Sequence, residues 1–188
     1  LGWLHRSGQC YSTGEQRVYD HDFRHLAQGL LVPHGIYDYF ENLGFMTLGT
    51  SHETSAFVCE AIALTWEAEL QRRYSTCTEI VLTFDAGGAN AARSLRFKED
   101  LVALSARLGR PLRIAHYPPY TSKWHPIEHR LFSHVERALR GVILDSHDTA
   151  LHAVQRTRTE TGLRVKARIL DKVYEIGRKC SDTFRDIK

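Results

Sequence analysis

The sequence has no long apolar run and no recognisable targeting segment. Its apolar stretches, such as residues 29–32 and 80–82, are far shorter than the roughly 20 residues that a membrane-spanning helix requires. The N-terminal residues lack the apolar region of a signal peptide. A membrane or secreted protein is therefore a poor fit, and we expect a cytoplasmic protein without a membrane partner.

Paired cysteines are also missing. The four cysteines, at positions 10, 59, 77 and 180, are scattered, and no two have C-x-x-C spacing, so a zinc ribbon or a thioredoxin-type site is not expected. Scattered cysteines without a signal peptide are typical of a reducing cytoplasm. The chain also opens on Leu1-Gly2-Trp3 and not on Met, so we expect a fragment whose N-terminal part lies elsewhere.

What is present suits one globular domain with an anionic partner. The chain has 188 residues, of which 43% are hydrophobic and 25% charged, values typical of a single soluble domain. The formal net charge is only +3, but residues 156–179 contain eight Lys and Arg against three Asp and Glu. Such a local excess can bind phosphates; the alternative is a solvated basic face.

The alternation of strand and helix patterns predicts an α/β fold. Short apolar segments alternate with segments whose apolar residues recur at helical spacing. This order favours a mainly parallel sheet, covered by helices on both faces, with an antiparallel edge. The predicted strands are residues 8–13, 36–40, 45–49, 79–84, 112–116 and 163–170; the predicted helices begin after Ser51 or Thr54, near Ala92, near Pro126 and after Ser146, and Gly109 and Gly141 end the second and third.

Asp85 directly follows the strand predicted over residues 79–84, whose continuous apolar run indicates burial on both faces. The carboxyl ends of such strands are where α/β proteins bind their ligands. Gly87 and Gly88 follow and leave room for a ligand to approach closely. The alternative is that Asp85 only starts a turn, because Asp-x-Gly-Gly is a common turn composition.

Glu128 lies 43 residues after Asp85, in the first turn of the helix that Pro126 opens. A carboxylate there interacts favourably with the helix dipole, so capping is the alternative role. The two carboxylates together indicate a metal site more strongly than either does alone. Hard cations such as Mg²⁺ are bound by carboxylates that converge from separate elements. Two such ions can activate an attacking oxygen and stabilise a leaving oxygen in phosphodiester chemistry.

The motifs around both residues resemble those of DDE transposases. Residues 117–132, YPPYTSKWHPIEHRLF, look like the third-carboxylate motif, whose P-P-x6-P-I-E core is similar to that of the mariner-type group. The longer form, with Ser122-Lys123-Trp124, resembles the Rhodopirellula transposase DDE family of bacterial insertion sequences. Its Asp-x-Gly-Gly-x-Asn motif matches residues 85–90. Further similar segments are His21-Asp22-Phe23, residues 33–38 and residues 161–165.

The resemblance implies an RNase H-like (retroviral-integrase-type) domain over residues 1–188, with a mixed sheet flanked by helices. Asp85 and Glu128 would be catalytic ligands of two Mg²⁺ or Mn²⁺ ions. Water would cleave DNA at the element ends, and the freed 3′-OH would attack target DNA without a covalent protein–DNA intermediate. DNA is then the expected partner, a homo-oligomer on DNA the expected assembly, and the bacterial nucleoid the expected location.

The resemblance also implies that one catalytic residue is missing. The family's first catalytic Asp lies on the first strand of the sheet, before a segment that resembles Leu1-Gly2. We therefore expect that strand to be largely missing and the isolated chain to be inactive. None of the early carboxylates is expected to replace the Asp, because none follows a strand suited to lie beside the Asp85 strand; they are Asp20, Asp22 and Asp38.

Residues near the two carboxylates are candidates for DNA contacts. Lys123 and Arg130 flank Glu128 and are expected to contact phosphates, with ordinary surface charge as the alternative. Asn90 is expected to position the Gly-Gly turn or a DNA strand. Trp124 is capable of stacking on a base, although core packing is its expected role. The candidates in the basic segment are Arg164, Lys166 and Arg168.

Two other functions fit parts of the sequence. His125-Pro-Ile-Glu128-His129 matches the H-x-x-E-H pattern of zinc peptidases. However, Pro126 puts His125 at a frayed helix end, and a further acidic ligand is unassigned. The other alternative is a non-catalytic DNA-binding or dimerisation remnant of a decayed element, which the basic segment 156–179 and the expected lack of the first Asp favour.

Overall fold

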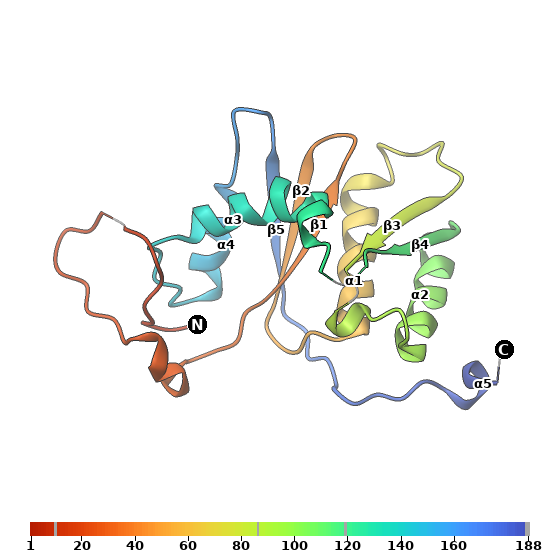
Figure 1. The fold of residues 1–188 in the computed structure, drawn as a ribbon, viewed down its shortest axis with the longest axis horizontal. Coiled ribbons are helices and arrows are strands. Elements are labelled where there is room, and N and C mark those ends of the chain that lie inside the picture. Colours follow the sequence, from red (N-terminus) through yellow and green to blue (C-terminus); the bar gives the residue numbers. More distant parts are fainter. Residues whose placement is uncertain (10, 86, 119, 187–188) are drawn as a thin grey trace. The chain divides into compact units, whose positions relative to one another are not determined.

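A computed structural model describes residues 1–9, 11–85, 87–118 and 120–186, in which strands and helices alternate along the chain (Figure 1). The predicted mixed α/β class is confirmed. The strands are β1 (Val32–Asp38), β2 (Leu43–Gly49), β3 (Ile80–Phe84), β4 (Leu112–His116) and β5 (Arg164–Leu170). The α-helices are α1 (Ser55–Thr65), α2 (Leu95–Leu108), α3 (Ser133–Leu139), α4 (His147–Gln155) and α5 (Asp182–Arg185). Short 3-10 turns cover His21–Leu26, Gly88–Asn90 and Ser122–Trp124, and π-helical turns cover Trp66–Leu70 and Glu128–Phe132.

The described chain divides into two compact units. The first unit is Leu1–Ser51 with Pro126–Lys172, and the second unit is His52–His125 with Val173–Lys188. Each has its own sheet: β1-β2-β5 in the first and β3-β4 in the second. The strands thus form two sheets where the sequence suggested one, and the single domain expected over residues 1–188 stays a prediction.

The sheet of the first unit begins with the predicted hairpin. β1 and β2 pair antiparallel, with Ile36 opposite Phe45, and β2 pairs parallel with β5. The predicted antiparallel edge and late strand are therefore confirmed. β1 starts at Val32, earlier than predicted, because its ladder with β2 continues as far as Gly49.

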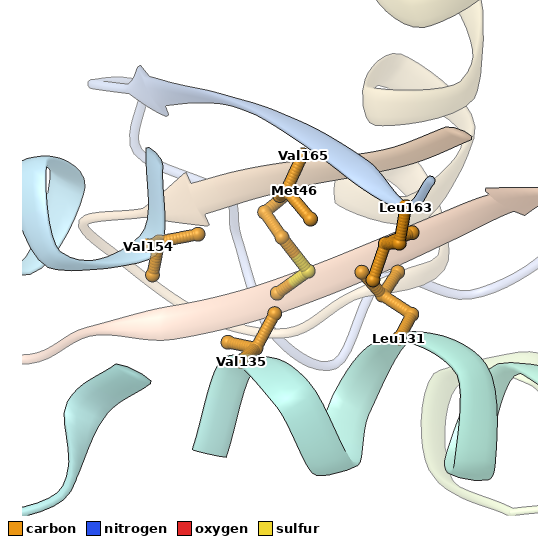
Figure 2. Close-up of a cluster of buried hydrophobic side chains, with 6 residues drawn as sticks. All are labelled: Met46, Leu131, Val135, Val154, Leu163 and Val165. Atoms are coloured by element: carbon orange, nitrogen blue, oxygen red, sulfur yellow. The ribbon is translucent and has the colours of Figure 1, made fainter. Parts of the chain in front are cut away.

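One face of this sheet carries the core of the first unit (Figure 2). Glycines on two strands let the helix that follows Pro126 approach closely: a Cβ at Gly35 would collide with the Phe132 ring, and one at Gly44 with Leu131. The strand glycines therefore set how deeply this helix sits on the sheet. The buried cluster consists of Met46, Leu131, Val135, Val154, Leu163 and Val165.

Among the described residues of the second unit, helix packing covers one face of its sheet. β3 and β4 pair parallel, as predicted. Phe84 is 7% exposed and packs edge-to-face on Phe97 of α2, with ring centroids 5.3 Å apart. Val81 points the other way and is 58% exposed. The prediction that residues 79–84 are buried on both faces is therefore wrong, because helix packing reaches only the alternate residues of β3.

Local signals position the helices of the second unit. The Thr54 hydroxyl accepts a hydrogen bond from the Phe57 amide at 3.2 Å and caps α1. Ser94 caps α2 in the same way, so α2 starts after Ser94 and not at Ala92. Gly109 ends α2, as predicted, and adopts the left-handed conformation with φ 61°.

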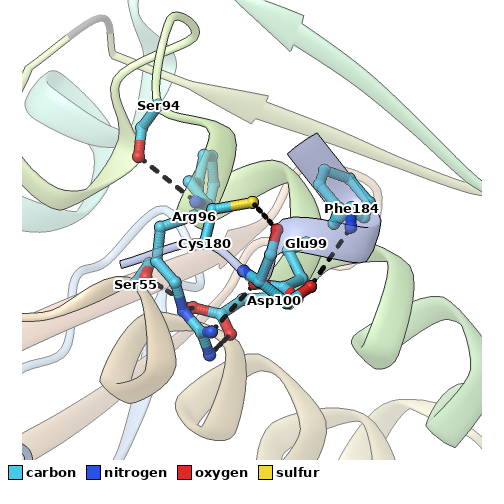
Figure 3. Close-up of polar contacts among 9 residues, drawn as sticks. Ser55, Ser94, Arg96, Glu99, Asp100, Cys180 and Phe184 are labelled. Atoms are coloured by element: carbon cyan, nitrogen blue, oxygen red, sulfur yellow. Dashed lines mark hydrogen bonds and ion pairs between the residues drawn. The ribbon is translucent and has the colours of Figure 1, made fainter. Parts of the chain in front are cut away.

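Polar contacts hold α1, α2 and the C-terminal segment of the second unit together (Figure 3). Arg96 pairs with Asp100, which also accepts a hydrogen bond from the Ser55 hydroxyl at 2.5 Å. Glu99 accepts a hydrogen bond from the Ser181 amide at 3.3 Å. The hydrogen bonding of Ser181 lowers the pKa of the Glu99 carboxyl.

The first residues of the chain differ from their prediction. The strand expected over residues 8–13 is absent from its described residues, and Cys10 lies outside them. Gly8 has φ 123° and lies against the backbone of Gly141, whose amide donates to the Ser7 carbonyl at 3.0 Å. Gly141 itself, at φ 70°, follows the end of α3, as predicted.

Cys59 offers a test of the packing of α1. It is 8% exposed, and burial raises the pKa of its thiol from 9.0 to about 12. Because the thiolate is the reactive form, we expect iodoacetamide at pH 8 to label Cys59 at least about 100-fold more slowly in the native protein than in urea. Peptide mass spectrometry will measure both rates, with the less buried Cys77 as internal control. Equal native and denatured rates for Cys59 would contradict the packing.

The raised pKa of Cys59 also predicts an alkaline loss of stability. The unfolded thiol ionises near pH 9, whereas the folded thiol stays protonated up to about pH 12. The contribution of the protonated Cys59 thiol to the free energy of unfolding is therefore complete below pH 9 and is lost as the pH rises towards 12.

Candidate active site

Asp85 lies at the carboxyl end of β3, in an exposed position directly after Phe84. Its Oδ1 accepts a hydrogen bond from Asn90 Nδ2 at 3.4 Å. Gly88, at φ 56°, opens the short turn that returns Asn90 to the aspartate. The predicted role of Asn90 in this turn thus has a geometric basis. Ala86, within the same motif, lies outside the described residues.

His116 is a further neighbour of this turn and was not among the predicted site residues. It ends β4 opposite Phe84, and its Nε2 lies 2.8 Å from the Asn90 carbonyl oxygen. The signal was available, because the carboxyl ends of neighbouring parallel strands meet at one edge of a sheet. His116 therefore supports the turn that carries Asn90, whose side chain is hydrogen-bonded to Asp85.

Glu128 lies in the first unit, on the helix that starts at Pro126, as predicted. It is half-buried and begins the π-helical turn Glu128–Phe132. Turns of this wider type are frequent at functional sites. Two residues of the turn, Leu131 and Phe132, pack on the strand glycines, so Glu128 is carried by a firmly seated helix.

The two predicted metal ligands belong to different units: Asp85 to the second and Glu128 to the first. Each offers the hard carboxylate oxygens that suit Mg²⁺ or Mn²⁺. Within the described residues, no three or more His, Cys, Asp or Glu side chains gather as a metal-binding group. The oxygen atoms of the two carboxylates are of the kind that binds Mg²⁺ or Mn²⁺, and they would supply part of the ligand set.

Two of the predicted DNA-contacting cations lie over aromatic rings. The Lys123 ammonium is 5.2 Å from the centroid of Trp124, and the Arg130 guanidinium is 5.2 Å from that of Tyr39. Trp124 is 68% exposed, so its expected core packing is wrong: the turn that carries it turns the indole to solvent. Pro119, in the same loop, lies outside the described residues.

The remaining candidate cations alternate along β5. Arg164 and Lys166 are exposed and Arg168 is half-buried, while Val165 between them packs in the core. Since side chains alternate across a strand, the three cations share the face opposite the core cluster. They form a basic row on the sheet of the first unit.

The geometry does not favour the zinc-peptidase alternative. His125 precedes the helix, is 8% exposed, and packs on the Tyr117 ring with centroids 4.4 Å apart. The H-x-x-E-H pattern requires its ligands on one continuous helix, a condition that His125 does not meet.

Asp38 has a structural role in the hairpin turn. Its Oδ1 accepts hydrogen bonds from the Phe40 amide at 3.1 Å and the Glu41 amide at 3.3 Å. These two hydrogen bonds hold the Asp38 carboxylate against the backbone of the turn.

These features define an α/β protein with an exposed Asp at the carboxyl end of a parallel strand. The family model for the Rhodopirellula transposase DDE domain matches residues 1–187, and the chain therefore belongs to this family. Searches of curated proteins and of solved structures returned no match. Among the described helices, none has the length and apolarity needed to cross a membrane. The family indicates an enzyme of the transposase type that acts on DNA.

Proposed function

We propose that this chain is the catalytic part of a bacterial insertion-sequence transposase, and that Asp85 and Glu128 are ligands of two Mg²⁺ or Mn²⁺ ions. The observation that carries the proposal is the exposed Asp85 at the carboxyl end of β3, with Asn90 hydrogen-bonded to its carboxylate. Protein groups at such strand ends face the ligand crevice of α/β folds. Glu128 adds a second carboxylate in the longer motif that the family shares.

The reaction proposed is hydrolysis at the element end, followed by attack of the freed 3′-OH on target DNA. When bound, the metal ions supply activation of the attacking oxygen and stabilisation of the leaving oxygen. In this chain, Asn90 restrains the Asp85 carboxylate, and His116 holds the Asn90 carbonyl. The helix seated on Gly35 and Gly44 holds Glu128.

We further propose that the family's first catalytic Asp lies on a strand that pairs with the open edge of β3 and completes an RNase H-like sheet. β3 pairs with β4 on one side, and its other edge carries no strand among the described residues. A two-stranded sheet is marginally stable alone, so this edge is suited to accept a further strand. Without such a strand and its Asp, we expect no catalysis.

A second candidate function is that of a non-catalytic DNA-binding or dimerisation remnant. The basic row on β5, formed by Arg164, Lys166 and Arg168, fits it. This row serves either function, since both require phosphate contacts. In both cases the protein acts in the bacterial cytoplasm at the nucleoid, and we propose a homo-oligomer on DNA.

DNA binding through the basic row predicts a measurable salt dependence. Each phosphate that the protein neutralises adds about −0.9 to the slope of log K against log salt. We expect the double variant Arg164→Gln/Lys166→Gln to make this slope shallower by about 1–2. Fluorescence anisotropy with labelled duplex DNA over a series of salt concentrations will measure the slopes.

Arg113→Gln is the matched control for this measurement. Arg113 is exposed on β4 and pairs with Glu79 at 3.0 Å. Its replacement should leave the salt slope unchanged. A wild-type slope near zero would refute DNA binding through phosphates. An unchanged slope in the double variant would show that the phosphate contacts are made by residues other than Arg164 and Lys166.

A further inference from the structure

The turn between β1 and β2 exposes two aromatic side chains. Tyr39 is 57% exposed and Phe40 is 87% exposed. Their rings meet edge-to-face, with centroids 6.1 Å apart and an interplanar angle of 85°. Large exposed apolar groups on adjacent residues mark an interaction surface more often than an isolated exposed ring does.

The turn that carries these rings is firmly built. The Asp38 carboxylate caps the amides of Phe40 and Glu41. Asn42, at φ 53°, accepts a hydrogen bond from the Tyr37 hydroxyl at 2.9 Å, and its own amide donates to the Thr161 carbonyl at 3.1 Å. These contacts fix the turn to the segment before β5, so the exposed rings are held in place and not left on a loose loop.

Arg130 connects the turn to the proposed catalytic helix. Its guanidinium lies 5.2 Å from the Tyr39 ring centroid. Arg130 is in the same π-helical turn as Glu128. Hence the aromatic pair lies at the end of the first unit that carries a proposed metal ligand.

The surroundings of the pair suit a nucleic acid. Arg164 starts β5 opposite Leu43, the first residue after the turn, but its side chain lies on the face of the sheet opposite the core cluster. Arg130 is therefore the cation beside the rings, and its charge offsets that of Glu41, which is acidic and exposed in the turn. Aromatic faces beside guanidinium groups are how proteins bind unpaired bases, with stacking on the rings and phosphates on the cations.

We infer that Tyr39 and Phe40 form a stacking surface for an unpaired base of the DNA strand that is bound at Glu128. The inference rests on the proposed function and goes beyond it, because it names the hairpin turn as a contact with unpaired DNA. Stacking on this surface holds the strand end after the duplex has opened, while Arg130 neutralises an adjacent phosphate.

The test compares two DNA ligands that carry the same number of phosphates, one with bases in its overhang and one without. Fluorescence anisotropy will measure binding of the 188-residue chain to a duplex with a single-stranded overhang, and to the same duplex with an abasic overhang. We expect the wild type to bind the base-containing overhang about 10-fold more tightly. In Tyr39→Ala/Phe40→Ala this ratio should fall to about 1, with the affinity for the abasic overhang kept within about 2-fold.

The control is Tyr11→Ala, which removes another fully exposed aromatic ring of the first unit and should keep the wild-type ratio. A double variant that keeps the ratio overturns the inference. So does a changed oligomeric state with an unchanged ratio, which would make the turn a contact between copies. Equal wild-type affinity for both duplexes overturns the inference alone, whereas binding to neither overturns the proposed function with it.

Discussion

Asp85→Asn will lower DNA cleavage at least about 1,000-fold in a transposase that joins residues 1–188 to the family's first catalytic Asp. The change keeps the shape of the side chain and removes its charge. Stabilisation of transition-state charge by bound metal ions is worth several kcal/mol, and about 1.36 kcal/mol corresponds to a tenfold change in rate. Glu128→Gln should have an effect of the same order. Gel assays of a labelled element end with Mg²⁺ and with Mn²⁺ will measure both.

Matched controls remove the same charges elsewhere. Asp182→Asn alters a 92% exposed side chain, and Glu136→Gln alters a 68% exposed side chain on the helix of Glu128. Both should keep cleavage within about 2-fold, since exposed ion pairs contribute little. Asp85→Cys should recover activity with Mn²⁺ more than with Mg²⁺, because a thiolate is a poor ligand for the harder ion. Wild-type cleavage by Asp85→Asn would contradict the proposal.

Nicking by the isolated chain tests whether residues 1–188 hold a complete set of metal ligands. We expect the 188-residue protein to show no Asp85-dependent nicking with either metal ion, because two carboxylates hold the ions poorly. Robust nicking that Asp85→Asn abolishes would show instead that residues 1–188 contain a complete set of ligands.

Local signals predicted most elements of the fold. Thr54 and Ser146 cap their helices as the sequence suggested, and Gly109 ends α2 in the left-handed conformation. These signals act over one turn of chain and are readable without tertiary structure. The burial of β3 was predicted wrongly, because apolar residues such as Val81 do not reveal which face a helix covers. That depends on contacts with α2, which lies later in the chain.

The positions of the two candidate carboxylates in the fold could be predicted, and the contacts around them less so. Asp85 was expected at a strand end because it follows an apolar run, and Glu128 in a first helical turn because Pro126 marks a helix start; their roles stay predictions. His116 was missed because its contact with Asn90 arises from the pairing of β4 with β3. The exposure of Trp124 was also misjudged, since aromatic residues are usually buried and a short turn decides otherwise here.

Gly44→Ala and Leu131→Ala will each destabilise the first unit, but together they will cost less than the sum of the two. Leu131 is fully buried, and its truncation should cost about 2–5 kcal/mol. A Cβ at Gly44 would collide with the Leu131 side chain, and such overpacking costs about 1–3 kcal/mol. In the double variant the new methyl group enters the space that Leu131 vacates, so we expect a favourable coupling of about 1–2 kcal/mol. Urea unfolding followed by circular dichroism will give the four free energies.

Gly14→Ala is the control, because a Cβ there meets no atom within 4 Å and should leave stability nearly unchanged. A neighbour of Gly44, Val165 Cγ2, would remain 3.1 Å from the new methyl group, so rescue should be partial. Strictly additive costs would show that Leu131 does not rest on Gly44 in solution. Because Leu131 lies in the same π-helical turn as Glu128, such a result would also remove the packing that is proposed to hold the Glu128 carboxylate.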